Sequence, residues 1–375
     1  MLGFFLLMSG FGFYRLRSRK LMLTLACMGL AVFGYGFTAC PCPVGMFQNI
    51  AESAALGTPI SLGVLLLFVI PLATSMFFGR IFCACACPLG AVQELLHWKT
   101  VQVPRPLDRV LRMVPILLFF VFTVMAANGM GLTACYYDPY LPLFLLSFTL
   151  PFAVITMVFL VLGLIVSRPF CRYFCPYGVL LRFFAMFAAK QPQITVGDCI
   201  NCKLCEQGCP NGAIISPETL TLPEVQQHGA RRLSALVALT PFALLLGGIL
   251  GSLAAPIISA YHPHVRLLRM LNSGEQTLEV EAFETSGASL ATLEINVIAA
   301  QNSILLGMSA SGILFAGCVM AELIAESRRR QEDEKYSIDR ALCFCCGRCY
   351  PSCPLERQGI RFNAKIEEQN VKELP

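Results

Sequence analysis

Charged residues are scarce in this sequence: they make up 14% of its 375 residues, whereas about 25% is usual in a soluble protein. Hydrophobic residues make up 56%. A chain of this length cannot bury so much apolar surface in one water-soluble core, so its long uncharged runs must face lipid. The scarcity of charge therefore excludes an ordinary soluble enzyme and indicates an integral membrane protein.

Histidine is scarce too, and all four residues lie outside the uncharged runs: His97, His228, His262 and His264. This argues against a b-type haem held by paired histidines within the membrane, and the lack of C-x-x-C-H excludes covalent c-type haem. The sequence shows no nucleophile–base set, phosphate-binding glycine loop or nucleotide fingerprint. Its uncharged runs contain no Asp, Glu, Lys or Arg, which argues against an ion pump formed by this chain alone.

Six uncharged runs are long enough to cross about 30 Å of hydrocarbon as helices. They cover residues 21–39, 58–78, 113–134, 143–166, 233–260 and 296–321. With both chain ends on one side, that side holds 26 of the 28 Lys and Arg residues, and only Arg266 and Arg269 lie on the other. This asymmetry predicts that the basic side faces the cytoplasm, in a bacterial inner membrane. The net charge of +5 is then a topology signal, and we expect no nucleic-acid partner.

Two motifs occur twice along the first four runs. The pattern G-x-T-A-C is found at 36–40 and 131–135, and R-x-F-C-x3-C-P-x-G is found at 80–90 and 168–178. Agreement at both ends of a helical hairpin predicts an internal two-helix repeat.

The chain has 19 cysteines, and eight of them follow ferredoxin spacing in two separated segments. The segments read Cys199-x2-Cys202-x2-Cys205-x3-Cys209-Pro210 and Cys343-x2-Cys346-x2-Cys349-x3-Cys353-Pro354. In such motifs three cysteines bind one [4Fe–4S] cluster and the fourth binds the neighbouring cluster. The exchange predicts cluster 1 on Cys199, Cys202, Cys205 and Cys353, and cluster 2 on Cys343, Cys346, Cys349 and Cys209.

The two C-x3-C-P motifs contribute Cys83, Cys87, Cys171 and Cys175. Each motif offers two thiolates and a cube requires four, so we expect the repeat to bring all four together around a third cluster. The alternatives are a structural thiol set, or a redox relay that also uses Cys85.

Three cysteines are expected on the outer side: Cys40, Cys42 and Cys135. A Cys40–Cys135 disulfide and an outer redox site explain them equally well.

The predicted outer loop contains Ser286-Gly287-Ala288-Ser289, which resembles the S-G-A-T motif of covalently flavinylated respiratory subunits. That resemblance implies FMN attached to Ser289 through a phosphoester. Small residues at the start of a helix are the commoner explanation, and flavin attachment is the alternative hypothesis.

The C-x3-C-P repeats and the ferredoxin motifs together resemble NapH/NosR-type membrane polyferredoxins, over about 21–215 and 340–356. The resemblance implies a quinol-linked electron carrier that serves a periplasmic redox protein. We therefore expect an electron-transfer subunit of a membrane respiratory complex, which exchanges electrons with a quinone or a cytoplasmic donor and with partner subunits. Quinol dehydrogenase activity would follow from the same resemblance. The main alternative is an assembly factor, because some related polyferredoxins resemble metal reductases that help to mature a cytochrome oxidase.

The predicted fold is an all-α membrane protein of about six transmembrane helices with the two-helix repeat, plus a small cytoplasmic dicluster ferredoxin-like domain assembled from two separated segments. Its expected divisions are the interfacial N-terminus (1–20), the duplicated four-helix membrane domain (21–190), the first ferredoxin half (191–232), a fifth transmembrane helix (233–260), a periplasmic loop (261–295), a sixth transmembrane helix (296–321), and the second ferredoxin half with the tail (322–375).

Overall fold

A computed structural model describes residues 1–36, 43–98, 101–136, 138–145, 149–190, 192, 202–215, 223–332 and 337–354. The described chain is mostly helical, as the sequence predicts, and includes one small sheet. In chain order its elements are α1 (Leu2–Phe11), η1 (Gly12–Leu16), α2 (Arg19–Gly29), η2 (Leu30–Gly36), α3 (Pro43–Leu56), α4 (Leu62–Phe78), η3 (Phe82–Ala86), α5 (Pro88–Leu96), α6 (Arg105–Leu111), α7 (Val114–Ala127), α8 (Thr133–Tyr136), α9 (Leu141–Leu145), α10 (Leu150–Ile165), α11 (Pro169–Tyr173), α12 (Tyr177–Ala185), α13 (Leu204–Gly208), β1 (Ile214–Ile215), α14 (Pro223–Ser259), α15 (Pro263–Ser273), α16 (Leu278–Thr285), α17 (Leu290–Glu332), β2 (Ser337–Ile338) and η4 (Tyr350–Ser352).

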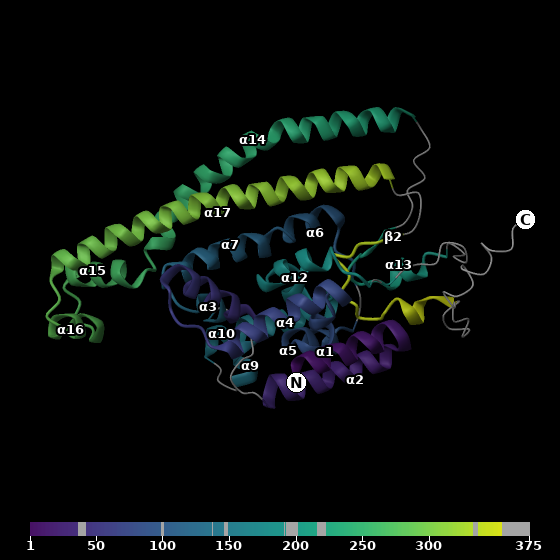
Figure 1. Ribbon diagram of the computed structural model, residues 1–375, viewed down its shortest axis with the longest axis horizontal. Coiled ribbons are helices and arrows are strands. Elements are labelled where there is room, and N and C mark those ends of the chain that lie inside the picture. Colours follow the sequence, from purple (N-terminus) through teal and green to yellow (C-terminus); the bar gives the residue numbers. More distant parts are fainter. Residues whose placement is uncertain are drawn as a thin grey trace, which may run out of the picture.

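Two long helices, α14 and α17, form a pair along one side of the molecule (Figure 1). Small residues let their backbones touch: a Cβ added to Gly251 would lie 2.1 Å from the Met308 carbonyl oxygen, and one added to Gly312 would lie 2.0 Å from that of Gly247. Close approach at glycines is typical of helices that pack within a membrane.

Three helical segments among the described residues are long and apolar enough to span a membrane: 106–127, 233–259 and 290–325. They match the third, fifth and sixth of the six expected runs. The second and fourth expected runs are represented by shorter apolar helices, 62–78 and 150–165, and the first falls on α2 and the π-helical η2.

Local signals explain why these helices are shorter than their apolar runs. The run at 58–78 becomes helical only at Leu62, because Ser61 is the N-cap and its hydroxyl accepts a hydrogen bond from the Val64 amide at 3.4 Å. The run at 143–166 is divided between α9, which ends at Leu145, and α10, which begins at Leu150, where Pro151 in the first turn favours the start. Hydropathy alone does not reveal either start.

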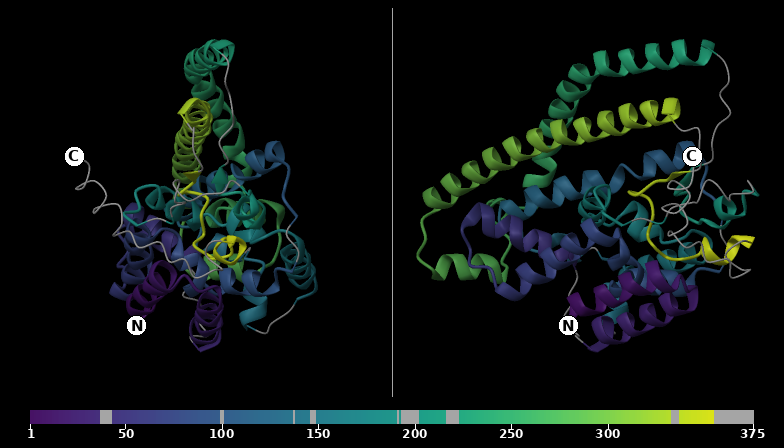
Figure 2. Two further views of the ribbon diagram at one scale, coloured as in Figure 1. Left: turned by 90° about the vertical axis from the view of Figure 1, so that its right-hand side faces the viewer. Right: turned by 45° about the vertical axis from the view of Figure 1, so that its right-hand side comes forward.

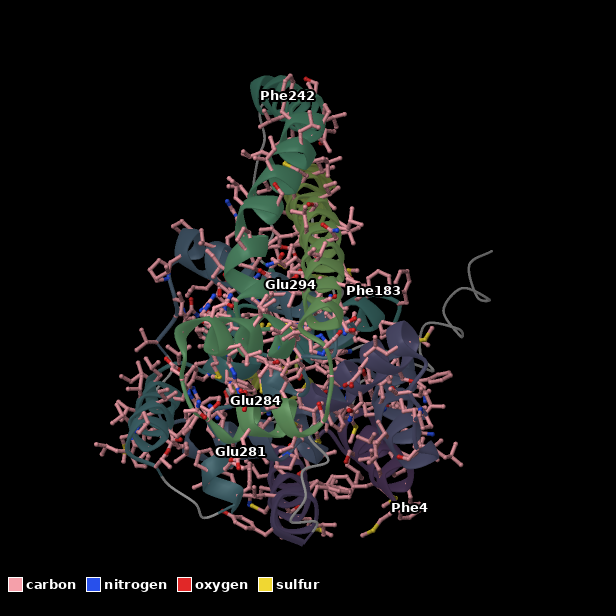
Figure 3. All side chains as sticks on the ribbon, turned by 90° about the vertical axis from the view of Figure 1, so that its left-hand side faces the viewer. Phe4, Phe183, Phe242, Glu281, Glu284 and Glu294 are labelled. Carbon is pink, nitrogen blue, oxygen red and sulfur yellow. The ribbon has the colours of Figure 1, made fainter. Side chains whose placement is uncertain are left out.

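The segment between α14 and α17 contains two helices, α15 and α16, at the opposite end of the long pair from β2 and α13 (Figure 1). Glu281 and Glu284 lie on α16 and Glu294 lies at the start of α17, whereas Phe242 lies far from them on α14 (Figure 3). Phe242 is 69% exposed, in keeping with a lipid-facing helix.

The two cysteine-rich segments meet at the end of the molecule occupied by β2 and α13 (Figure 2). Strands β1 and β2 pair antiparallel, with Ile214 opposite Ile338 and Ile215 opposite Ser337. The Asp339 amide continues the contact by donating to the Ala213 carbonyl at 2.8 Å. Segments that lie more than a hundred residues apart are thus joined at one place.

Candidate iron–sulfur sites

The first C-x3-C-P motif lies in the buried core. Cys83 belongs to the π-helical turn η3, and Cys87 is the N-cap of α5, whose first residue is Pro88. Proline suits this first helical position because its missing N–H would have no partner there. Both cysteines are 5% exposed.

The second motif is arranged in a similar way. Cys171 lies in α11, and Cys175 precedes α12. The backbone amides of Gly90 and Gly178 favour the thiolate forms of Cys87 and Cys175, and the Gly178 amide also donates to the Cys175 carbonyl oxygen at 3.1 Å. The glycine of each C-P-x-G therefore supplies a backbone donor to the cysteine three residues before it.

Cys83, Cys87, Cys171 and Cys175 come together as one group, here named the C-x3-C-P site. Cys87 interacts electrostatically with the other three cysteines, and Cys175 interacts with Cys171 and Cys83. Burial raises the pKa of Cys171 to about 12 and the pKa values of Cys87 and Cys175 well above their usual range. Thiolates are therefore favourable here only beside a positive centre such as iron.

The donors around the C-x3-C-P site fit a sulfur-rich, negatively charged group. Gln93 donates through Nε2 to the Cys171 sulfur at 3.3 Å. Arg80 and Arg168 also face the site, and Arg80 Nε and Arg168 Nη2 are buried N–H groups without a hydrogen-bond partner among the described residues. A bound [4Fe–4S] cluster would offer sulfur acceptors to these donors and charge to both guanidinium groups.

No group of three or more His, Cys, Asp or Glu within the described ranges is arranged to hold a single metal ion. The four cysteines of a [4Fe–4S] cube each bind a different iron, so they stand further apart than the ligands of one ion.

A second group is formed by Cys209, Cys343, Cys346 and Cys349, here named the second ferredoxin site. All four line one cavity, beside Phe344 and Asn211. These are the ligands that the sequence predicts for cluster 2, three from one segment and one from the other. The Ala213 amide donates to the Cys209 sulfur at 3.4 Å, and burial raises the pKa of Cys346 to about 11.

The cysteines predicted for cluster 1 are described in part. Cys199 lies outside the described residues. Cys202 is exposed, and Cys205 and Cys353 are half-buried. Helix α13 packs on η4, where a Cβ added to Gly208 would lie 2.3 Å from the Ser352 hydroxyl oxygen, so this close approach brings Cys205 and Cys353 to neighbouring elements.

Of the three outer cysteines, Cys135 falls among the described residues, as does Ser289. Cys40 and Cys42 lie outside the described residues. Cys135 lies against α3, where a Cβ added to Gly45 would lie 2.6 Å from the Cys135 sulfur. Ser289 precedes α17, and its hydroxyl accepts a hydrogen bond from the Thr292 amide at 3.2 Å, which is an N-cap contact.

Sequence reasoning missed a buried carboxylate, Glu94 on α5, which lies between the two cysteine sites. It is paired with Arg19, Arg168 and Arg348, from three distant segments. Although burial alone would raise the pKa of Glu94, the three arginines lower it to about 2. The only signal in the sequence is an acidic residue within the otherwise uncharged helix that follows the first C-P-x-G.

A family described as a 4Fe-4S binding domain matches the chain at residues 60–106 and again at 148–193. Each match contains one C-x3-C-P motif. The chain is thus similar to a 4Fe-4S binding domain at two places. This domain supports the presence of [4Fe–4S] clusters in a protein with membrane-spanning helices.

Three curated relatives match parts of the chain. Two proteins of Methanocaldococcus jannaschii, MJ0749 and MJ0750, are 42% identical over 64 residues and 44% identical over 57 residues, which is 17% and 15% of this chain. A protein of Escherichia coli named "Putative electron transport protein YccM" is 28% identical over 118 residues, or 29% of this chain. The matches span 26%, 24% and 33% of those relatives. No solved structure matches the chain. Together, the domain and YccM support an iron–sulfur electron-transfer role.

Proposed function

We propose that this protein is the iron–sulfur electron-transfer subunit of a respiratory complex in a bacterial inner membrane. In this role it passes electrons between [4Fe–4S] clusters on the cytoplasmic face, a quinone or partner subunit, and a periplasmic redox protein. The observation that carries the proposal is the placement of two four-cysteine groups next to one another, one largely buried and one half-buried, at the end of the molecule where both ferredoxin segments meet.

The residues that would hold the clusters are the C-x3-C-P site, the second ferredoxin site, and Cys199, Cys202, Cys205 and Cys353. When bound, a [4Fe–4S] cluster takes up and releases one electron. The chain's own contribution is to exclude water, to supply the amide donors of Gly90, Gly178 and Ala213, and to neutralise added charge with arginine. These contacts set the potential at which an electron enters.

The membrane context follows from the distribution of basic residues. The side predicted to be cytoplasmic carries the cysteine segments and 26 of 28 Lys and Arg residues. Electrons that cross about 30 Å of hydrocarbon need a carrier on the far side. Cys40, Cys42 and Cys135, FMN on Ser289, or a haem in a partner subunit would supply it.

The test is anaerobic purification of the full chain in detergent, with iron and acid-labile sulfide measured per chain and EPR recorded after dithionite reduction. Three clusters correspond to about 12 iron atoms per chain and two clusters to about 8. Cys83→Ser and Cys343→Ser should each remove one cluster's share of the iron. A chain that binds no iron would overturn the proposal, and an unchanged iron content in Cys83→Ser would remove the third cluster from it.

The physiological role is tested in cells by purifying the native complex and identifying its other subunits. Reduction of the clusters by a quinol would support the respiratory role. Defective copper-dependent maturation of an oxidase without loss of steady respiratory flux would instead favour the assembly-factor alternative.

A further inference from the structure

One aromatic side chain lies between the two cysteine sites. Phe344 follows Cys343 in the sequence and is 2% exposed. The Arg80 guanidinium lies 3.9 Å from the centre of its ring, and the Arg168 guanidinium lies 5.3 Å from it. Both distances are within the range of cation–π attraction, which is strongest where water is excluded.

The two arginines occupy the same position in the two R-x-F-C motifs, and each is anchored independently of the ring. Arg80 donates through Nη1 to the Ala341 carbonyl at 3.3 Å, so it is hydrogen-bonded to the backbone two residues before Cys343. Arg168 donates through Nη1 to the Cys83 carbonyl and through Nε to Glu94 at 3.0 Å. The pair therefore connects the segment that carries Cys343 with both C-x3-C-P motifs.

The charges of both arginines reach cysteines of both sites. Arg168 interacts with Cys83 and Cys171 on one side and with Cys346 on the other. Arg80 interacts with Cys171 and with Cys343. Each guanidinium therefore stabilises negative charge in either site, which matters where an added electron must be accommodated first on one side and then on the other.

Building on the proposed function, we propose that Arg80 and Arg168 clamp Phe344 and thereby dock the second ferredoxin site against the C-x3-C-P site as the contact through which an electron passes between them. With clusters held by the cysteines of both sites, the single electron given up at one site would be taken up at the other. No bond forms or breaks, and no proton is transferred. Arg80, Arg168 and Phe344 are positioning residues.

The clamp has a physical advantage for this step. Electronic coupling between two carriers falls steeply with their separation, and a segment that moved away would interrupt it. The ring fills the contact without a polar group that would draw in water, and the two guanidinium groups hold it from separate elements. The contact therefore stays dry and short.

The test uses the full chain, purified anaerobically in detergent, reduced with dithionite and examined by EPR beside an iron assay. Two reduced paramagnetic clusters held this close should broaden each other's signals. Phe344→Ala should keep the iron content and lose the broadening, whereas Phe344→Tyr should keep both. Phe183→Ala is the matched control, because this phenylalanine on α12 is 52% exposed.

The outcomes separate the clamp from the proposed function. Unchanged broadening in an iron-loaded Phe344→Ala variant would overturn the clamp and leave the proposed function intact. Absence of iron from one of the two sites in the unmodified chain would also overturn the clamp, whereas absence of iron from the whole chain would overturn the proposed function itself. If Phe344→Ala loses iron, Phe344→Leu keeps most of the apolar volume and should retain iron with reduced broadening. Loss of iron from Phe344→Leu as well would overturn the proposal. The ring would then be needed to form one cluster site, and not to hold the two sites together.

Discussion

Glu94 and Arg168 form an ion pair in the interior of the protein: Arg168 Nε donates to Glu94 Oε2 at 3.0 Å, and the two side chains are 2% and 1% exposed. The second motif reverses this charge. The position equivalent to Glu94 is Arg182, which pairs with Glu322 on α17 at 2.5 Å. The two motifs thus share their cysteines and glycines, but each uses its following helix to bind a different neighbour.

Replacing Glu94 with Gln should destabilise the protein strongly. The change removes the charge that Arg19, Arg168 and Arg348 share, and loss of one partner from a buried pair costs about 3–5 kcal/mol. Urea unfolding of the detergent-solubilised chain measures the difference. The control Glu322→Gln breaks a pair that is 23% and 29% exposed, and it should cost only about 0–1 kcal/mol.

The unmodified chain and Glu94→Gln should differ in their free energy of unfolding, and the pH dependence of this difference follows from the lowered pKa of Glu94, about 2 in place of 4.5. A carboxylate with a lowered pKa contributes stability that is complete above its ordinary pKa and is lost as pH falls towards the folded value. The gap between the unmodified chain and Glu94→Gln should therefore stay constant from pH 8 to pH 5. A gap that shrinks by pH 5 would contradict the lowered pKa.

Replacing Gln93 with Leu should lower the reduction potential of the C-x3-C-P site. The amide donates to the Cys171 sulfur at 3.3 Å, and such a bond stabilises the more negative, reduced cluster. Leucine occupies the equivalent position in the second motif, at Leu181, so the chain accommodates this side chain there. Redox titration by EPR measures the change, and the second ferredoxin site of the same molecule is the internal control. Equal shifts at both sites would argue against a local effect.

The two ferredoxin loops differ in the residue at one left-handed position, so introducing glycine in one loop and removing it from the other should have opposite effects on stability. The residue after the second cysteine is left-handed in both, with φ of 59° at Lys203 and 73° at Gly347. A left-handed conformation costs a residue other than glycine about 1–2 kcal/mol. Lys203→Gly should therefore stabilise the loop and Gly347→Ala should weaken it, as measured by the rate at which a chelator removes iron. Equal effects of the two changes would contradict this.

Ser289 offers a test that separates its two hypotheses. Ser289→Ala should destabilise the start of α17 by about 1 kcal/mol, because the bond from the Thr292 amide is lost. Ser289→Asp keeps an N-cap acceptor and should restore the stability, but it cannot carry FMN through a serine phosphoester. Fluorescence of the denatured protein band then reports flavin: a signal in the unmodified chain that disappears in Ser289→Asp would establish attachment at this residue.

The sequence anticipates the long helices better than the short ones. The run at 296–321 lies within α17, and the run at 233–260 lies within α14 except for its last residue, because uninterrupted apolar residues leave few alternatives to a helix in lipid. Helix α17 continues to Glu332, since hydropathy marks the edge of the lipid and not the end of the helix. Helix α3 was not predicted, because Gln48 and Glu52 interrupt its apolar pattern; in the structure, Gln48 is buried and accepts a hydrogen bond from the Ala134 amide at 3.0 Å.

The candidate sites, too, could be predicted only in part. Spacing identifies which cysteines group together, because cluster ligands follow short regular intervals along the chain. Ligation by each cysteine stays a prediction. Spacing says nothing about Glu94 or the Phe344 clamp, since their partners come from segments whose proximity depends on the complete fold. The R-x-F-C motif shows that an arginine recurs at the same position. It does not show that Arg80 and Arg168 both contact the Phe344 ring.

The β1–β2 pairing can form only after the ribosome has synthesised both long helices. Ile338 follows its partner Ile214 by 124 residues, and both long helices are translated in that interval. At about 5–20 residues per second the ribosome needs about 6–25 s to produce the second strand. During this delay Cys209 has been synthesised, but Cys343, Cys346 and Cys349 have not. The cavity is therefore complete only after α14 and α17 have been made and folded back, and a cluster bound there by all four cysteines would mark a chain in which both helices are in place.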